Sequence, residues 1–254
     1  MRSLFCWQSL ARRTGCRFAG YQSTRLHRQS NYTFPMCGRF ALKTPPARLA
    51  THFDLAEVED FLPRYNIPPG TDIPVIRHSP EGKRVLHLLH WGLVPHWAKD
   101  SSIGNKLNNA RGESVAEKPS FREAFKRRRC LIPADGFYEW KAEGKLKQPY
   151  YISLNSGDPM AMGGLWESWR TPDGKILRTC CIITTGSNAV MAPIHDRMPV
   201  IIAPDDWKAW LEGPVDEVVR MVQPYNPSEM LAWAVNRRVS KTADDDAGLI
   251  EPIT

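Results

Sequence analysis

The sequence lacks any hydrophobic run long enough to cross a membrane, and it has no internal repeat and no low-complexity linker. A membrane-spanning helix needs roughly 20 consecutive, mostly apolar residues. Cysteine is scarce, and none of the six cysteines forms a CxxC motif that is matched by a second one. Paired motifs of that kind are typical of structural zinc sites. We therefore expect no membrane association, no metal and no other cofactor.

Acidic residues are absent from residues 1–36, which contain six arginines. Removing those six from the 34 basic residues of the chain leaves 28 against 27 acidic ones, so the formal charge of +7 belongs mostly to this leader. Bulk charge governs non-specific attraction to nucleic acids. Any affinity of the remaining chain for DNA is therefore expected from a local basic patch.

The leader also lacks the apolar core, about 7–15 residues long, of a secretory signal. Three origins fit its composition: translated sequence upstream of a later start at Met36, an organellar transit peptide, or a pro-segment that is removed. We expect residues 1–36 to be absent from the mature protein under all three, which would leave Cys37 as its first residue.

The remaining chain is predicted to form one α+β domain, residues 37–240, with a tail at 241–254. Strands of varied length separated by short helices do not give regular βαβ alternation, so we expect a mixed, partly barrel-like sheet with peripheral helices. Strands are expected at 39–42, 73–77, 85–91, 130–140, 150–154, 160–166, 178–185, 195–203 and 230–235, and helices at 46–53, 118–129, 188–194, 204–211 and 216–222. The segment 65–70 is expected to be a rigid proline loop, Cys180-Cys181 to lie in the core of a protein from a reducing compartment, and Asp244-Asp245-Asp246 to be solvated.

Met36-Cys37-Gly38 is the most informative motif, because a cysteine at a chain terminus carries both a free α-amine and a thiol. The amine condenses with an aldehyde to an imine, and the thiol then closes on the imine carbon as a five-membered thiazolidine. An internal cysteine cannot do this, since its nitrogen is an amide. The alternative is an ordinary buried cysteine, which is the usual fate of this residue type.

Asn109 and Arg111 belong to a second candidate segment, Asn108–Glu113. The amide of Asn109 could hold a reacting group, and the planar guanidinium of Arg111 suits phosphate oxygens. The alternative is a loop in which Asn109 caps a following helix.

Glu139 and His195 lie in two further candidate segments. Glu139 is surrounded by aromatic residues, which should desolvate the carboxyl, raise its pKa and let it move protons near neutrality; otherwise it is an edge-strand residue that faces water. His195 precedes Asp196 and Arg197 at a helix-to-strand junction, where it could act as an acid near pH 7. Its alternative role is a histidine held by local hydrogen bonds.

Taken together, these segments resemble the SOS-response-associated peptidase (SRAP) family, whose members shield abasic sites. The resemblance runs from Met36 to about Asn236 and rests on MCGRF, RYNIPPG, HWGLVPHWAKD, NNARGES, RRRCLIPADGFYEW, IITT and MAPIHDRMPVII. The ending NARGES departs from the more usual NARxET, which should affect only loop geometry. The leader is the serious departure, since an uncut chain should be inactive. The resemblance implies a pseudo-barrel fold with a positively charged groove for single-stranded DNA.

The resemblance also implies a role for each candidate residue. Cys37 would cross-link to the opened sugar of an abasic site, Asn109 would orient the cysteine and the adduct, Glu139 would be the acid/base, and His195 would contact the sugar hydroxyl. Phosphate contacts would come from Arg39, Arg111 and Arg197, and base stacking or strand wedging from Trp97. The implied activities are abasic-site processing, self-processing peptidase activity and weak lyase activity through the Schiff base.

We expect a monomer whose partners are single-stranded DNA containing abasic sites and replication-fork proteins. It would be cytoplasmic and nucleoid-associated in a bacterium, or nuclear or organellar in a eukaryote. Two other functions are compatible with the sequence. One is an amidohydrolase of the N-terminal-nucleophile class, since class II glutamine amidotransferases also begin Met-Cys-Gly. The other is a reader of modified DNA that forms no covalent bond.

Overall fold

The computed structural model describes residues 37–253. The predictions for the leader, residues 1–36, including its removal after Met36, lie outside the described residues. Within the described part of the chain, no helix is long and apolar enough to span a membrane.

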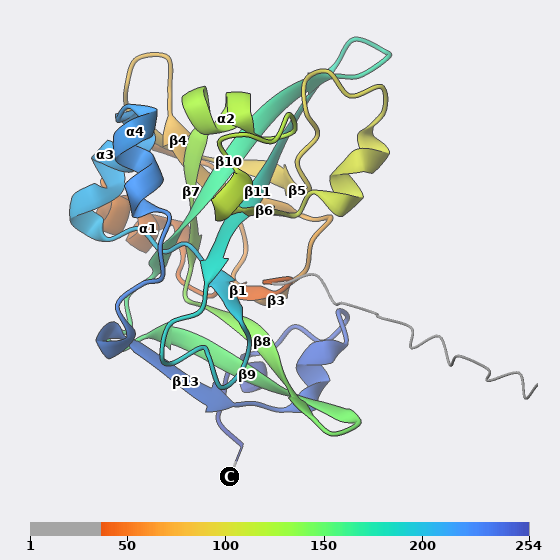
Figure 1. Cartoon of the computed structure of the whole chain (residues 1–254), viewed down its shortest axis with the longest axis vertical. Coiled ribbons are helices and arrows are strands. Elements are labelled where there is room, and N and C mark those ends of the chain that lie inside the picture. The colour runs from red at the N-terminus through yellow and green to blue at the C-terminus, as the bar shows by residue number, and fades with distance from the viewer. Residues whose placement is uncertain (1–36, 254) are drawn as a thin grey trace, which may run out of the picture. The chain divides into compact units, whose positions relative to one another are not determined.

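Five strands form a closed mixed barrel in the upper part of Figure 1. They are β4 (Asp72–His78), β5 (Arg84–Trp91), β7 (Arg129–Ala134), β10 (Met160–Arg170) and β11 (Ile176–Gly186). The neighbouring pairs from β11 through β10, β7 and β4 to β5 are antiparallel, and a parallel pairing of β5 with β11 closes the ring. The expected mixed, barrel-like sheet of an α+β fold is confirmed.

Three short strands extend the barrel. β2 (Glu57–Val58) pairs with β5, whereas β6 (Asn109–Arg111) and β12 (Arg197–Pro199) both pair with β11. The last two strands bring the NNARGES and IHDRMP segments to the same barrel strand, although about 85 residues separate them in the chain.

A second, open sheet lies below the barrel in Figure 1. Its order is β13 (Met230–Ala234), β9 (Leu146–Leu154), β8 (Gly136–Glu143), β1 (Phe40–Leu42) and β3 (Arg64–Ile67). All its pairings are antiparallel. β1 is therefore an interior strand, with β8 on one side and β3 on the other. The residues just before β1 enter the sheet between β8 and β3.

Short helices lie beside the barrel strands: α1 (Pro46–Phe53), α2 (Arg122–Arg127), α3 (Trp207–Glu212) and α4 (Val215–Val218). α1 begins where Pro45-Pro46 fixes the backbone for a first turn, as expected from the sequence. The core contains Cys180 and Cys181, both fully buried, which confirms the predicted core position of these cysteines. The four described cysteines are free.

One predicted strand is wrong in extent. The apolar run 130–140 is not one strand, because it divides at Asp135 into β7 of the barrel and β8 of the open sheet. The carboxylate of Asp135 accepts hydrogen bonds from the backbone nitrogens of Lys43 (2.7 Å) and Thr44 (2.8 Å). These bonds hold the corner between the two sheets.

Other predictions need smaller corrections. The segment 188–194 forms turns instead of a helix, since Pro193 has no N–H to continue one. The strand expected at 195–203 is only β12, and the helix expected at 118–129 shortens to α2. The expected loop 65–70 begins with part of β3. The acidic triplet is at the surface, as predicted, but its side chains are engaged in ion pairs with Arg64 and Arg238.

Candidate functional site at Cys37

The backbone nitrogen of Cys37 donates a hydrogen bond of 2.6 Å to Oε1 of Glu139. The register of the open sheet causes this contact. β1 and β8 pair Phe40 with Phe137, and the Tyr138 nitrogen bonds to the Arg39 carbonyl at 2.9 Å, so the residues before β1 run alongside Glu139. Glu139 lies on an interior strand and is only 4% exposed, so the alternative of a water-facing edge residue is wrong.

Burial controls the ionisation of both side chains. It raises the pKa of Glu139 from 4.5 to about 7, against the lowering effect of the hydrogen bond from Cys37. The Cys37 thiol is also buried, and burial together with the nearby Glu139 carboxylate raises its pKa well above its ordinary value. The pair therefore combines a carboxyl that can exchange protons near neutral pH with a thiol that stays protonated.

Cys37 has a backbone φ of 46°, in the left-handed region that is uncommon for residues other than glycine. Such a conformation costs on the order of 1–3 kcal/mol in a residue with a side chain. The torsion is defined by the peptide bond that precedes Cys37, so it exists only while that bond is intact.

A cavity of about 410 Å³ opens beside this pair. Its lining residues come from several elements: Gly38, Arg39, Pro68, Pro69, Glu139, Trp140, Lys147, His195, Ser240 and Thr242. Three predicted site residues, Arg39, Glu139 and His195, thus share one cavity.

His195 reaches the cavity from the loop before β12, and its side chain is 25% exposed. Its Nδ1 accepts a hydrogen bond from the backbone nitrogen of Arg197 at 3.0 Å and lies 3.0 Å from Oδ1 of Asp196. With Nδ1 accepting from the backbone, the proton of the neutral ring sits on Nε2. When the ring is protonated, Asp196 can pair with it.

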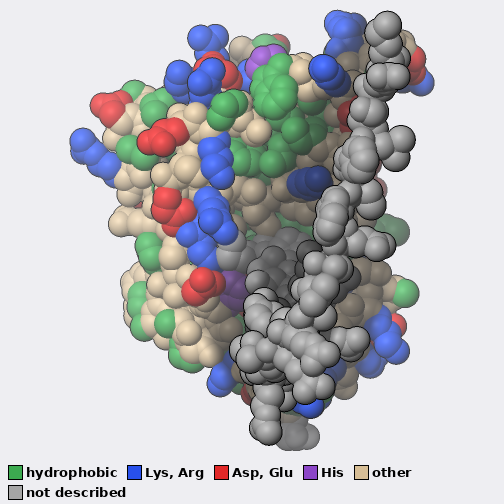
Figure 2. Space-filling model, turned by 45° about the vertical axis from the view of Figure 1, so that its right-hand side comes forward, with side chains coloured by type: hydrophobic (Ala, Val, Ile, Leu, Met, Phe, Trp, Pro, Cys, Tyr) green, Lys and Arg blue, Asp and Glu red, His purple; other side chains and the backbone are tan. Residues whose placement is uncertain are grey.

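Arg197 and Arg111 lie together around Thr184 of β11, outside the lining of the cavity. Nη2 of Arg197 donates to the Thr184 carbonyl at 2.8 Å and to Oε2 of Glu113 at 3.0 Å. Hydrogen bonding to Arg197 lowers the pKa of Glu113, and the charge of Arg111 adds to the effect. Figure 2 shows a column of basic side chains on one face, with acidic side chains beside it and a histidine near its lower end.

The remaining two predicted residues lie on other elements. Asn109 is half-buried on β6, opposite Ile182 of β11. The two helical segments that follow have Arg111 and Phe121 at their N-caps, so the alternative that Asn109 caps a helix is wrong. Trp97 follows β5, is 50% exposed, and donates its indole N–H to the Pro119 carbonyl at 3.4 Å. Its position leaves one of the largest apolar surfaces of the described chain open to solvent.

Sequence reasoning missed four polar residues at the site, one of which is Lys147 of β9 in the cavity lining. Asn66 is fully buried and bonds to Arg39, while Ser240 and Thr242 line the cavity from the C-terminal segment. RYNIPPG contained the signal for Asn66, since an asparagine between apolar strand residues needs a partner. No pattern in the sequence pointed to the C-terminal pair.

No group of three or more potential metal ligands occurs within residues 37–253. The site itself offers the nitrogen and thiol of Cys37, the carboxyl of Glu139 and the imidazole of His195, with the guanidinium of Arg39 in the cavity lining.

The fold and the site define a mixed β-barrel protein with a buried cysteine–glutamate pair at the wall of an open cavity. The chain belongs to the SOS response associated peptidase (SRAP) family, whose pattern matches residues 36–242. This confirms the resemblance in the sequence.

Named relatives cover most of the chain. The abasic site processing protein YoqW of Bacillus subtilis (strain 168) is 42% identical over 223 residues, which span 85% of this chain and 99% of the relative. The abasic site processing protein HMCES of Xenopus tropicalis is 29% identical over 267 residues, spanning 85% and 79%. A solved structure of a Bacteroides thetaiotaomicron protein matches with a TM-score of 0.79 at 25% identity, covering 86% of this chain and 100% of that one.

Proposed function

We propose that this protein recognises abasic sites in single-stranded DNA and forms a thiazolidine cross-link with them through Cys37, once the preceding residues have been removed. The family and its named relatives support abasic-site processing as the general activity. The observation that carries the finer mechanism is the 2.6 Å contact between the Cys37 nitrogen and a buried carboxyl whose pKa is about 7.

The first step is the release of the Cys37 nitrogen as an amine. Hydrolysis of the bond before Cys37 converts the amide that now donates to Glu139 into an α-amine at the same place. The left-handed φ of Cys37 supports this step, because cleavage removes the torsion and its conformational cost. Self-processing of this bond is part of the proposal.

The amine then attacks the aldehyde of the opened sugar. An α-amine with a pKa of about 7.7–8.0 is partly neutral at physiological pH. His195 lines the same cavity and assists ring opening by moving a proton at the sugar hydroxyl. A bond forms between nitrogen and carbon, and the carbonyl oxygen becomes a hydroxyl.

Glu139 acts at the dehydration of this carbinolamine. Its protonated form gives a proton to the departing hydroxyl, which leaves as water, and its ionised form accepts the proton that the nitrogen loses. The product is a Schiff base. A carboxyl with a pKa of about 7 supplies both forms at neutral pH.

The thiol of Cys37 closes the ring last. Its sulfur bonds to the imine carbon, its proton passes to the nitrogen, and the strand is held as a thiazolidine with loss of one water overall. The raised pKa of the thiol supports this order, since a protonated thiol is a poor first nucleophile. The Schiff base can also undergo β-elimination, which would give a weak lyase activity.

The cations around the site are the proposed contacts to the DNA backbone. Arg39 lines the cavity, whereas Arg111 and Arg197 lie near Thr184 on the adjoining surface. Asn109, on the strand that carries Arg111, would orient the adduct. Trp97 would stack on a base or wedge the strand. A flipped sugar in a small cavity favours single strands, in which less stacking and pairing must be broken.

The test uses a chain that begins at Cys37 and a fluorescent single-stranded oligonucleotide with one enzymatically generated abasic site. We expect a heat-stable protein–DNA band on a denaturing gel, with an intact mass equal to protein plus oligonucleotide minus one water. Absence of this band would refute the cross-linking mechanism. Binding without the band would favour a non-covalent reader, and glutamine hydrolysis would favour the amidohydrolase.

Two controls isolate the nitrogen and the sulfur. A chain acetylated at the Cys37 nitrogen should form no adduct, because an amide cannot condense with an aldehyde. A chain with Cys37→Ser keeps the amine, so it should give an adduct only after borohydride reduction of the Schiff base. A stable adduct from the acetylated chain would contradict the proposal.

A further inference from the structure

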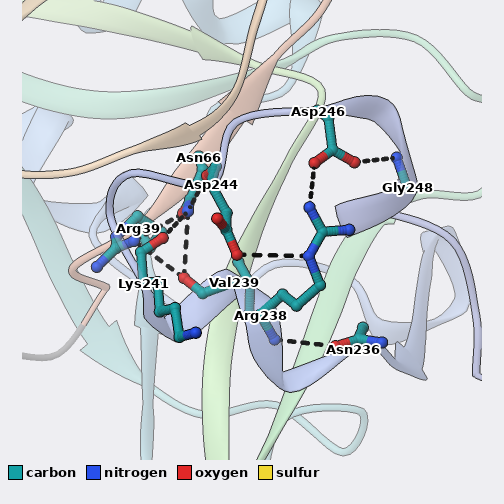
Figure 3. Close-up of polar contacts among 9 residues, drawn as sticks. All are labelled: Arg39, Asn66, Asn236, Arg238, Val239, Lys241, Asp244, Asp246 and Gly248. Carbon is teal, nitrogen blue, oxygen red and sulfur yellow. Dashed lines mark hydrogen bonds and ion pairs between the residues drawn. The ribbon is translucent and has the colours of Figure 1, made fainter.

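The side chain of Asn66 is a buried junction between β3, Arg39 and the C-terminal segment. Its Oδ1 accepts a hydrogen bond of 2.7 Å from Nη1 of Arg39. Its Nδ2 donates to three carbonyl oxygens, those of Val239 (3.2 Å), Lys241 (2.9 Å) and Asp244 (2.6 Å). Figure 3 shows these contacts converging on one amide. Both ends of this fully buried amide are therefore engaged.

Residues 236–250, here called the C-terminal strap, form the other side of this junction. Asp245 accepts hydrogen bonds from the Tyr65 nitrogen (2.5 Å) and from Nε of Arg64 (3.2 Å), which fasten the strap to β3. Within the strap, Arg238 pairs with Asp244 and Asp246. The strap is thus fixed at several points beside the cavity.

Arg39 uses only part of its guanidinium in these contacts. Nη1 donates to Asn66 and to the Val239 carbonyl (3.0 Å), and Nε donates to the Gly38 carbonyl (3.3 Å). Nη2 makes no hydrogen bond with the described residues. Arg39 lines the cavity together with Ser240 and Thr242 of the strap.

We propose that Asn66 is a positioning residue, which holds Arg39 against the strap so that its free Nη2 meets a backbone phosphate of the bound strand. This inference rests on the proposed function and adds a residue to it. An unrestrained arginine loses much side-chain freedom when it binds a phosphate. A guanidinium already fixed through Nη1 and Nε has lost that freedom before the DNA arrives.

The proposal also explains why an amide is needed at position 66. Nη1 of Arg39 needs a hydrogen-bond acceptor, whereas the three strap carbonyls need a donor, and one amide side chain provides both. A carboxylate would supply no donor and would neutralise the charge of Arg39. An apolar residue would leave all these buried groups without this partner.

The experiment measures non-covalent binding to a single-stranded oligonucleotide carrying a tetrahydrofuran abasic analogue, which has no aldehyde and cannot cross-link. Dissociation constants are obtained by fluorescence anisotropy over a range of salt concentrations. We expect Asn66→Ala to weaken binding on the order of tenfold, equivalent to about 1.4 kcal/mol. The salt slope should fall in magnitude by about 0.7, the value for one phosphate contact on a single strand.

Comparison with Arg39→Ala decides whether Asn66 acts through Arg39. Arg39→Ala should show the same loss of affinity and the same decrease in salt slope as Asn66→Ala. The double variant should bind the oligonucleotide no more weakly than Arg39→Ala alone. Asn66→Ser, which is too short to reach Arg39, serves if the alanine variant does not fold. Asn155→Ala is the matched control, since its amide donates to the Ser228 carbonyl away from the cavity.

The inference is wrong if the Asn66 variants lower only the melting temperature, or if their effects add to that of Arg39→Ala. Cross-linking of the unaltered chain, which like all the variants in this experiment begins at Cys37, to the natural abasic oligonucleotide is measured in parallel. If that cross-link forms while the Asn66 variants bind like the parent, only the positioning role fails. If the unaltered chain neither binds nor cross-links, the proposed function itself fails.

Discussion

The Cys37 nitrogen, just before β1, and the Glu139 carboxyl, on β8, meet at 2.6 Å although about 100 residues separate them in the chain. The contact brings the only part of Cys37 that cleavage would change, its nitrogen, to a carboxyl that burial keeps half-protonated near pH 7. Because both residues are almost fully buried, water competes little for this hydrogen bond.

Glu139→Gln should slow cross-linking without unfolding the protein. The glutamine oxygen can still accept from the Cys37 nitrogen, but the amide cannot exchange a proton. Loss of a positioned acid or base typically lowers a rate by 10²–10⁴-fold, so we expect a decrease of about that size. The rate of appearance of the covalent band under single-turnover conditions measures it. An unchanged rate would exclude Glu139 as the proton carrier.

Stability should depend on pH through Glu139 in a defined direction. The folded-state pKa of about 7 lies above the ordinary value of 4.5, so the unfolded chain loses this proton first as pH rises. The resulting stabilisation is complete below about pH 4.5, falls between pH 4.5 and 7, and is absent above that window. The full change is roughly 3 kcal/mol.

The measurement is the free energy of unfolding in urea, taken from pH 4 to 8 for the intact chain and for Glu139→Gln. The glutamine variant does not titrate at this position, so the difference between the two curves isolates Glu139. The unfolding free energy of the intact chain minus that of Glu139→Gln should fall as pH rises from 4.5 to 7. If this difference is constant or rises with pH, the pKa of Glu139 is not raised.

Part of this site could be predicted from local sequence. The aromatic neighbours of Glu139 predicted a desolvated carboxyl with a raised pKa, and its pKa of about 7 confirms this. Pro45-Pro46 likewise predicted the start of α1. Both signals lie within a few residues of the feature they specify, which is why they can be recognised in one sequence.

The remaining features depend on contacts between distant segments. The run 130–140 is mostly apolar; Asp135-Gly136 inside it can mark a turn, but it does not indicate which segment the Asp135 carboxylate contacts. The corner is made by hydrogen bonds to Lys43 and Thr44, which lie about 90 residues earlier. The position of the C-terminal strap could not be predicted for the same reason. The strap is held through its backbone carbonyls, which accept hydrogen bonds from Asn66, and its own residue types do not indicate this contact.

Asp135→Asn should destabilise the fold. The carboxylate is 7% exposed and receives three hydrogen bonds, including one of 2.7 Å from the Thr44 hydroxyl. The NH2 group of asparagine would face the Lys43 and Thr44 donors in place of a carboxylate oxygen that accepts from them. We expect the free energy of unfolding in urea to fall by about 2–3 kcal/mol. Asp173→Asn, at an exposed turn, is the control and should stay within about 0.5 kcal/mol of the parent. Equal effects of the two would show that the corner does not depend on this charge.

Glu113→Gln should tighten binding to single-stranded DNA. Glu113 pairs with Arg197 and lies near Arg111, so its carboxylate offsets positive charge at the proposed phosphate-binding surface. Removing that charge should increase the magnitude of the salt slope by about 0.7 if one further phosphate is engaged. Anisotropy titrations with the non-reactive tetrahydrofuran oligonucleotide report both affinity and slope. Weaker binding with a flatter slope would mean that Glu113 instead holds Arg197 in its binding position.

Trp97→Ala should weaken DNA binding while leaving the fold intact. The ring is 50% exposed and its single hydrogen bond, to the Pro119 carbonyl, is long at 3.4 Å, so its removal should cost little stability. Stacking of one base on an aromatic side chain contributes about 1–3 kcal/mol, and we expect a loss of affinity in that range. Because stacking involves no phosphate, the salt slope should not change, in contrast to the arginine variants. Trp97→Phe keeps a flat ring and should recover most of the affinity; if it binds as weakly as Trp97→Ala, the ring acts as a wedge of a particular size and not as a stacking surface.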